Sequence, residues 1–286
     1  EFDEAFTSHI GHTISNGVRA WVHGITSSRL GQTLANGAPE TMHYYRFTSR
    51  LAAAFAFLAD VSMLAMGGAL KRKEKISGRL GDVLSMLYLV SATLKHYEDQ
   101  GRQKEDLPMI RWVVRDLLYH AQEAIDGILS NFPVKSVATL LRWTIFPLGM
   151  SFRPPLASRN RECAQVLLAP GAARDRLTAG MYIGKGEGDP TGVLEAAFAA
   201  TIACEPIDEK LRKAVKKGKM VPRHGVDLGT VAREKELISQ DEYNQWLRKE
   251  ALRRQVIKVD DFPQDFGRAE ILAKLAQEKA PTAKAA

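Results

Sequence analysis

The sequence predicts an all-α protein, built as an antiparallel helical bundle followed by a smaller, loop-rich helical extension. Apolar residues recur at intervals of three and four over long stretches, and no stretch alternates as a half-buried strand would. Short polar segments with Pro and Gly separate these stretches, and helices joined by short connections pack antiparallel. We therefore assign residues 1–150 to the bundle and residues 151–286 to the extension, which ends in a disordered tail.

The first expected helix lies at the start of the chain. Phe2, Phe6, Ile10 and Ile14 share one helical face, yet no Asp, Ser or Thr cap precedes them. We therefore expect the chain to begin inside a helix, as the downstream part of a longer protein.

A second helix is expected from Arg46 to the Gly67–Gly68 pair, which weakens helical propensity. The next stretch reads KRKEKISGRLGDVLSMLYLV, a basic run that leads into an apolar stripe. A charge run beside such a stripe is typical of the solvent-facing side of a helix, and we favour this over a phosphate or nucleic-acid patch. We expect four leucine and valine side chains to be buried against the second helix and three basic side chains to be exposed. The four are Leu80, Val83, Leu84 and Leu87, and the three are Lys71, Lys75 and Arg79.

Two more helices complete the expected bundle. After the polar segment 99–108, apolar residues recur at helical spacing from Ile110 to Phe132, and Pro133 ends the pattern. A shorter helix is expected at 134–145.

The extension begins with residues 146–162, where three prolines and few periodic apolar residues predict an extended loop. Ser239 and Glu242 form a capping-box pattern that opens a helix to about Ile257. Other short helices are expected at 161–168, 191–203 and 207–217, and the tail is expected at 277–286.

The composition is that of a globular protein, with 286 residues of which 45% are hydrophobic and 26% charged. The longest apolar run, at 51–59, ends at Asp60 and is too short to cross a bilayer. Two cysteines are too few for a disulfide framework, which favours a reducing compartment. We expect a cytoplasmic protein that can associate with the inner membrane.

The formal net charge is +7, and the excess of basic residues is spread over the middle of the chain. Nucleic-acid binding needs basic residues on one face, often with aromatic residues between them. Because acidic residues are interleaved with the basic ones here, we expect no nucleic-acid partner.

Few residues are candidates for a metal or phosphate site. His9 and His12 could share a helical face, with His23 as a third member, but no cysteine or paired carboxylate completes the set, so we predict no metal site. The glycines of 184–192 match neither a Walker loop nor a dinucleotide fingerprint. We interpret them as a turn that leads into a helix start at Asp189.

The two cysteines, Cys163 and Cys204, are the remaining candidates. Neither has a histidine placed in sequence to suggest a nucleophile, and we interpret both as buried small residues.

Five segments of the chain closely resemble the C-terminal region of the large proteobacterial fatty acyl-CoA dehydrogenases of the FadE type. The resemblance covers nearly the whole chain apart from the tail. The segments are Phe6–Trp21 (FTSHIGHTISNGVRAW), Leu58–Asp99, Asp106–Pro133, Asp189–Ala197 (DPTGVLEAA) and Val259–Phe262 (VDDF).

The resemblance implies an FAD-dependent enzyme of fatty acid β-oxidation. It would remove hydrogens from the α and β carbons of a fatty acyl-CoA and pass the electrons to an electron-transferring flavoprotein. In that family a glutamate takes the α proton, while the β hydrogen leaves as hydride to the flavin.

The catalytic glutamate is expected upstream of Glu1, because the family carries it in a Glu-Gly-Ala/Thr-Asn type motif. The chain has one Glu-Gly pair, Glu187–Gly188, but Asp189–Pro190 follows it, so no catalytic residue is assigned. FAD is expected to be bound mainly by upstream domains, its contacts in this chain are unknown, and the segment alone is predicted to be inactive. An alternative is a non-catalytic helical module that docks on a membrane surface or a partner protein.

Overall fold

The computed structural model describes residues 1–30, 37–184, 188–258 and 265–278. All regular elements in these ranges are helices, which confirms the all-α prediction. The chain forms two compact units, Glu1–Ala179 and Gly180–Ala286. The first unit extends past residue 150 because the helix that follows the predicted loop packs against the bundle. The predicted boundary between the bundle and the extension, at residues 150 and 151, concerns the family's domains and stays a prediction.

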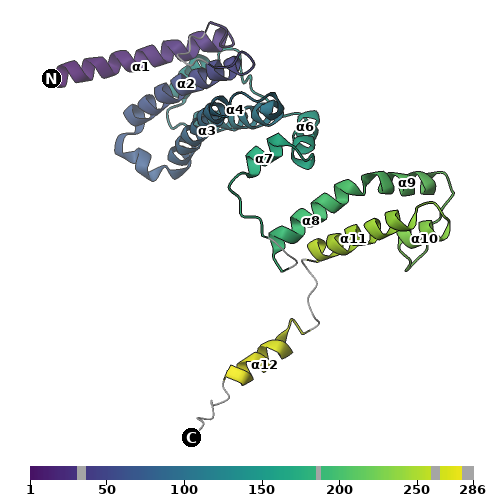
Figure 1. The fold of residues 1–286 in the computed structure, drawn as a ribbon. Helices are drawn as coiled ribbons and strands as arrows, with labels where there is room; N and C mark the ends of the chain where they lie inside the picture. The colour runs from purple at the N-terminus through teal and green to yellow at the C-terminus, as the bar shows by residue number, and fades with distance from the viewer. Residues whose placement is uncertain (31–36, 185–187, 259–264, 279–286) are drawn as a thin grey trace. The chain divides into compact units, whose positions relative to one another are not determined.

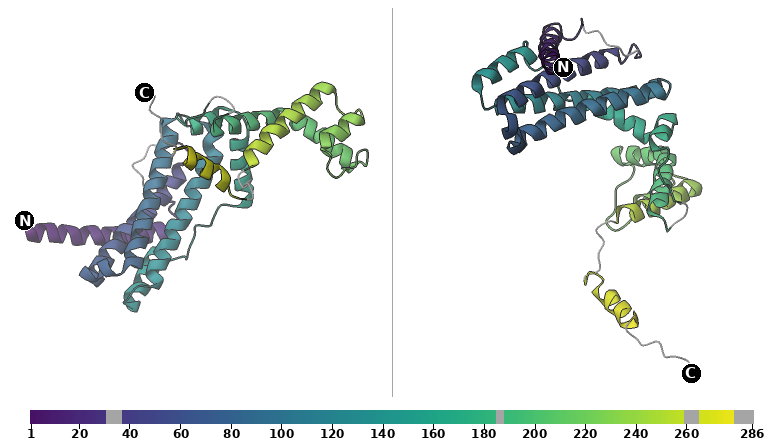
Figure 2. Two further views of the ribbon diagram at one scale, coloured as in Figure 1. Left: turned by 90° about the horizontal axis from the view of Figure 1, so that it is seen from below. Right: turned by 90° about the vertical axis from the view of Figure 1, so that its left-hand side faces the viewer.

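Unit 1 is built on long helices that pack side by side (Figure 1). Helices α3 and α4 run antiparallel along each other, while α1 packs on α2 and α5; the views in Figure 2 agree. The elements are α1 (Phe2–Ile25), α2 (Met42–Met66), η1 (Gly67–Arg72), α3 (Glu74–Asp99), η2 (Lys104–Asp106), α4 (Leu107–Ser130), α5 (Lys135–Ile145), α6 (Ala157–Leu168) and α7 (Ala172–Thr178).

The core of unit 1 is formed by the facing sides of α2, α3, α4 and α5. Each fully buried aliphatic side chain contributes about 1.5–3 kcal/mol by leaving water. Helices α1 and α2 approach closely at Gly17, where an added Cβ would lie 3.1 Å from the ring of Phe57. The fully buried side chains include Leu51, Leu58, Leu94, Leu118, Ile125, Ile128, Phe132, Leu141 and Ile145.

The outer face of α1 is apolar but exposed. Phe2, Phe6, Ile10 and Ile14 are all exposed, whereas the other side of the helix packs on the bundle. The periodicity at the start of the chain therefore predicts the helix, but the apolar stripe is not its buried face.

The prediction for α3 is confirmed at some positions and wrong at others. Val83 and Leu87 are buried and Leu80 is partly buried, but Leu84 is 56% exposed. Helix α3 buries a narrow seam in which contacts recur every three or four residues, and Leu84 falls outside it. Lys71 and Lys75 are exposed as predicted. Arg79 is instead half-buried, and it donates to the carbonyl oxygen of Gly127 at 3.2 Å.

Unit 2 contains a second, smaller core, to which residues between Cys204 and Trp246 contribute. The elements are α8 (Pro190–Ala203), α9 (Glu205–Lys216), α10 (Leu228–Glu234), α11 (Gln240–Ile257) and α12 (Arg268–Glu278). Ile207, Leu211, Val231 and Trp246 are buried together. A glycine is needed at 229, because an added Cβ would lie 2.4 Å from the Trp246 ring.

Capping residues in the sequence correctly predict the starts of α8 and α11 in unit 2. The Asp189 side chain accepts from the backbone N–H groups of Thr191 and Gly192, and the Ser239–Glu242 capping box is present. The expected helices at 191–203 and 207–217 are confirmed with ends shifted by one or two residues. Helix α6 begins four residues before Arg161. The short helices α7, α10 and α12 were not predicted.

One helical stretch in the described ranges, Met42–Arg72, has the length and apolar composition of a membrane span. It covers α2 and η1. Of its apolar window 28% is buried, and Leu51, Ala54 and Leu58 of α2 are among the buried residues.

Candidate functional site

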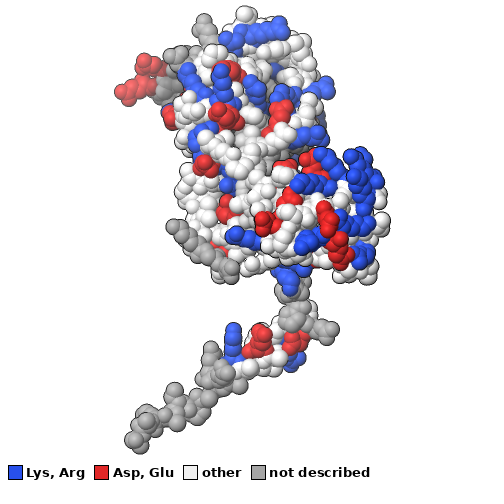
Figure 3. All heavy atoms as spheres, turned by 45° about the vertical axis from the view of Figure 1, so that its right-hand side comes forward, with Lys and Arg blue, Asp and Glu red and all other residues white. Residues whose placement is uncertain are grey.

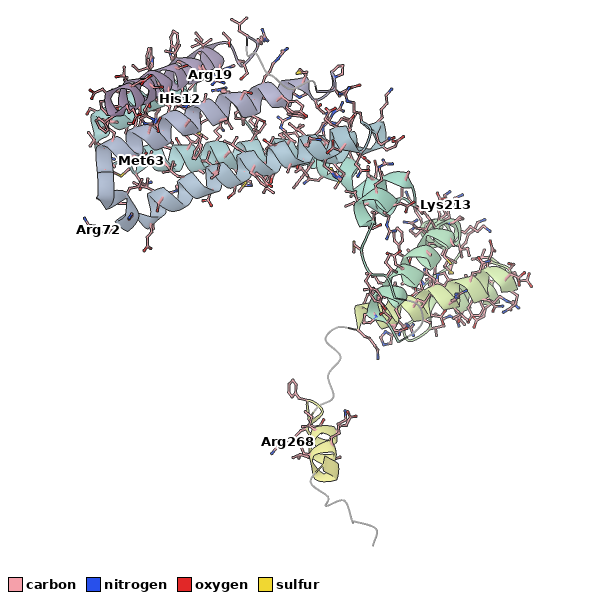
Figure 4. The ribbon with its side chains drawn as sticks, turned by 60° about the vertical axis from the view of Figure 1, so that its left-hand side comes forward. His12, Arg19, Met63, Arg72, Lys213 and Arg268 are labelled. Carbon is pink, nitrogen blue, oxygen red and sulfur yellow. The ribbon has the colours of Figure 1, made fainter. Side chains whose placement is uncertain are left out.

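The three histidines considered for a metal site do not come together with other ligands. His9 Nε2 lies 3.8 Å from Asp60 Oδ1, and His12 is exposed on α1, as Figure 4 shows. His23 is buried near the end of α1, and its Nδ1 has no hydrogen-bond partner. Within the described residues, no group of three or more His, Cys, Asp or Glu side chains could hold a metal ion.

Both cysteines are packed against neighbouring residues. Cys204 is buried in the core of unit 2, and burial raises the pKa of its thiol. Cys163 is partly buried; its thiol donates to the carbonyl oxygen of Pro108 at 3.4 Å, and burial raises its pKa as well. A raised thiol pKa lowers the fraction of nucleophilic thiolate, so neither environment activates the sulfur.

Several residues named from the sequence lie outside the described ranges. They include Glu187, the segment 259–262 and the tail residues 279–286. At the edges of the glycine-rich stretch, the Gly184 N–H donates to Thr191 Oγ1 at 2.9 Å. The described part of this stretch therefore serves the start of α8.

A polar cavity described in unit 1 has a volume of about 420 Å³, and we call it the arginine cavity. Its walls come from α2, from α4 and from the segment that follows α5. Ser27 lies at its edge, after α1. The residues that supply its charge and its aromatic surface are His43, Tyr44, Phe47, Arg50, Arg115, Phe152 and Arg153.

Arg50 is the central cation of the arginine cavity and is only 3% exposed. Its Nη1 donates to Ser151 Oγ at 3.0 Å and its Nη2 to the Ile145 carbonyl oxygen at 3.4 Å. Its guanidinium carbon lies 5.7 Å from the centroid of the Phe152 ring, and its Nε has no hydrogen-bond partner. Burial lowers the pKa of Arg50. The site thus holds a buried guanidinium that neutral groups satisfy only in part.

Gln122 of α4 holds the cavity wall in place. This fully buried side chain accepts from the N–H groups of Ser151 and Phe152 at 2.9 and 3.0 Å. Its Nε2 donates to the Phe152 carbonyl oxygen at 2.9 Å. The ring of Phe152 then meets that of Phe47 edge-on, with centroids 5.3 Å apart. The segment with three prolines, which the sequence predicts only as a loop, is therefore fixed against α2 and α4.

The electrostatic surroundings of the cavity are cationic. Burial lowers the pKa of His43, and the charges of Arg111 and Arg46 lower it further. Burial raises the pKa of Tyr44, which also lies in the field of Arg111 and Arg115. No carboxylate lines the cavity as described, so its chemistry is that of anion binding rather than proton abstraction.

Two other described cavities lie between α8 and α11 in unit 2. Their volumes are about 470 and 350 Å³, and Val193 and Gln255 line both. Neither is lined by a carboxylate. Figure 3 shows positive and negative side chains mixed on the face that it presents.

A basic end of unit 1 is visible where α2 gives way to η1. Lys71, Arg72, Lys73 and Lys75 are exposed there, and Figure 4 places Met63 and Arg72 at this same end. Gly67, with φ of +50°, ends α2 and turns the chain.

The fold and the cavities define an all-helical domain with a basic ligand-sized cavity and no carboxylate in the three cavities described. Residues 1–262 match the family described as acyl-CoA dehydrogenase, C-terminal, bacterial type. The chain therefore belongs to this family, as the sequence resemblance predicts, and its general context is that of acyl-CoA dehydrogenases acting on acyl-CoA. No solved structure matches the chain.

Proposed function

We propose that this chain is the C-terminal part of an FAD-dependent dehydrogenase that forms the α,β double bond of fatty acyl-CoA in fatty acid β-oxidation. The observation that carries the proposal is the family match over residues 1–262. It supports an oxidoreductase as the parent protein. The electrons would pass to an electron-transferring flavoprotein.

The reaction needs a base at the thioester-activated α carbon and an acceptor for the β hydride. A carboxylate in a dry cavity would supply the base, but none lines the arginine cavity or the two cavities of unit 2. We propose that the base is a glutamate of the parent enzyme upstream of Glu1, as the family resemblance implies.

FAD would supply the hydride acceptor when bound. Of the three cavities, only the arginine cavity combines cationic groups with aromatic walls. Its volume of about 420 Å³ is near the lower end of ligand pockets and cannot enclose the flavin, ribityl chain, pyrophosphate and adenosine together. The described residues therefore do not fit a whole FAD, which supports binding mainly by other domains of the parent enzyme.

Purification of the 286-residue chain tests this proposal. We expect a folded, helical and colourless protein that reduces no dye with any acyl-CoA, whereas a chain with the upstream domains is yellow and active. Flavin absorbance in this chain alone would contradict the proposal. So would acyl-CoA-dependent dye reduction that Glu187→Gln abolishes.

The basic end of unit 1 favours a second function, docking on an anionic membrane surface. Leu64 is 88% exposed and Met63 is 52% exposed, next to four exposed basic residues. Exposed apolar side chains at the same end as cations suit a surface of anionic lipid, where each nearby cation contributes about 1 kcal/mol. This role is compatible with association with the inner membrane.

A charge-neutralised variant tests the docking function. Changing Lys71, Arg72, Lys73 and Lys75 together to Gln should weaken binding to vesicles that contain anionic lipid, and added salt should erase the difference. The control changes Arg212, Lys216, Lys217 and Lys219 in unit 2, which are also exposed, to Gln. Equal vesicle binding by the two variants at low salt would exclude docking through this end.

A further inference from the structure

We propose that the arginine cavity of unit 1 is a binding site for the phosphate group of a small phosphorylated ligand. The cavity is formed entirely within unit 1, by α2, α4 and the segment after α5. The inference does not rest on the proposed dehydrogenase function.

The first argument is the unbalanced charge of the cavity. Arg50, Arg115 and Arg153 line it, and none of them forms an ion pair with a carboxylate of the described residues. A buried guanidinium without a counter-charge is costly, because desolvation is not offset by an ion pair. An anion bound in the cavity would supply that counter-charge.

The second argument is unused hydrogen-bonding capacity. The Arg50 side chain is only 3% exposed, and its Nε is buried without a hydrogen-bond partner. Donors that are left unpaired in a buried site are rare in folded proteins and point to a missing acceptor. Guanidinium groups match the oxygens of phosphate well.

The geometry favours phosphate over a carboxylate. A planar carboxylate is satisfied by one guanidinium along one edge, whereas a phosphate presents three oxygens in different directions. The three cations come from three different segments: Arg50 from α2, Arg115 from α4 and Arg153 from the segment after α5. The Nε of Arg115 donates to the Arg153 carbonyl oxygen at 3.1 Å, which holds these two residues together.

The size and walls of the cavity indicate the rest of the ligand. A volume of about 420 Å³ would be mostly empty around inorganic phosphate. Tyr44, Phe47 and Phe152 supply aromatic surface in the same cavity, and such surface packs well on a flat ring. We therefore assign the ligand to the phosphomonoesters that carry a ring and do not exceed a nucleotide in size.

Calorimetric titration of the 286-residue chain tests the site with five probes. Adenosine 5′-monophosphate represents the expected class, inorganic phosphate the phosphate alone, adenosine the ring alone, and acetate a carboxylate. We expect the nucleotide to bind best, phosphate to bind at least tenfold more weakly, and adenosine and acetate not to bind. Raising the salt concentration should weaken nucleotide binding. Coenzyme A is a fifth probe, and tighter binding than the monophosphate would identify its nucleotide end as the source of the phosphate.

The double variant Arg115→Gln/Arg153→Gln removes two cations from exposed positions, so the fold should persist. It should lower nucleotide affinity at least tenfold, and 10 mM phosphate should no longer raise the melting temperature. The control, Arg212→Gln/Lys216→Gln, removes the same charge from exposed positions of α9 in unit 2 and should bind as the unchanged chain does. The proposal is overturned if no phosphate-bearing probe binds at low salt. It is equally overturned if acetate binds as well as phosphate, or if the double variant binds as tightly as the control.

Discussion

At the scale of single residues, buried polar side chains shape unit 1 as much as apolar ones do. Gln122 is fully buried, yet all three of its hydrogen bonds go to the backbone of Ser151 and Phe152. These bonds satisfy backbone groups of an irregular segment that lacks helical partners of its own. The same segment contributes a cation and an aromatic ring to the arginine cavity, so Gln122 is a positioning residue for that site.

Replacing Gln122 by Leu should therefore destabilise unit 1. The change keeps the volume but leaves two N–H groups and one carbonyl unpaired, at an expected cost of roughly 2–4 kcal/mol. Urea unfolding followed by circular dichroism measures this free energy. Gln165→Leu on α6 is the matched control, because Gln165 is exposed, and it should change stability little. A Gln122→Leu protein as stable as this control would show that the segment is held by other contacts.

At the scale of elements, α3 shows that the neighbouring helix determines which residues of an apolar stripe are buried. Leu84 and Leu87 belong to the same apolar stripe, yet only Leu87 is buried. Helix α3 packs mainly along α4, and two long helices side by side cover only a narrow strip of each other. Leu84 lies beyond that strip.

The pair offers a direct comparison. Leu87→Ala should lower the free energy of unfolding by roughly 2–5 kcal/mol, because apolar contact is lost and a cavity remains. Leu84→Ala removes the same atoms from an exposed site and should change it by less than about 0.5 kcal/mol. Chemical denaturation of both variants measures the difference, and equal losses would mean that the α3 seam is misplaced.

The start of helix α11, in contrast, depends on a local hydrogen-bonding motif, the capping box. Ser239 Oγ accepts from the Glu242 N–H at 3.1 Å, and the Glu242 carboxylate accepts from the Ser239 N–H at 2.9 Å. Glu242 also pairs with Lys210 of α9. The start of α11 is therefore determined by residues three apart in the chain.

Ser239→Ala should cost about 1 kcal/mol, since one N–H at the helix start loses its acceptor. Hydrogen exchange of the first turn of α11 should accelerate. Ser85→Ala in the exposed interior of α3 is the control and should be neutral or slightly stabilising, because alanine is the better helix former there. If exchange at Glu242 were unchanged in Ser239→Ala, the capping box would not stabilise the helix.

At the scale of the whole molecule, the two units should respond to acid in different pH ranges. In unit 1, burial lowers the pKa of His23 from its ordinary 6.5, and Arg19 and Arg50 lower it further. The unfolded chain then binds the proton more readily than the folded chain does. The stability that neutral His23 contributes is therefore complete above pH 6.5 and is lost as the pH falls through the lowered pKa. In unit 2, the hydrogen bond from Lys210 lowers the pKa of Glu242 from 4.5. Its contribution is complete above 4.5 and is lost only at lower pH.

Hydrogen exchange by mass spectrometry at pH 7.5 and 5.5, corrected for intrinsic rates, measures both units in one experiment. Peptides of unit 1 should lose protection at pH 5.5, while those of α11 should not. His23→Gln should remove the share of the pH effect that His23 contributes, because the amide does not titrate, while the share of His43, whose pKa is also lowered, should remain. Equal loss of protection in both units, or an unchanged effect in His23→Gln, would contradict the assignment.

Most helices of this protein, and the family to which it belongs, can be predicted from its amino-acid sequence alone. Helical periodicity, proline stops and caps such as Asp189 and Ser239 act over three or four residues, so they can be read without knowing the fold. Long similarity over residues 1–262 adds family membership in the same direct way. Helices as short as α7 and α10 leave too few periodic residues to be predicted.

Which helix faces are buried and where a ligand could bind depend instead on how the helices pack. The exposure of Leu84 depends on which helix lies against α3, and the arginine cavity depends on residues far apart in the chain. Arg50 bonds to Ser151, 101 residues later, and Gln122 bonds to the backbone 30 residues later. Isolated arginines form no periodic or local sequence pattern. Acidic residues close to them in the sequence can also bring the net charge of the segment near zero. The physical reason is that helix formation is local, whereas burial and charge balance depend on which distant segments the packing brings together.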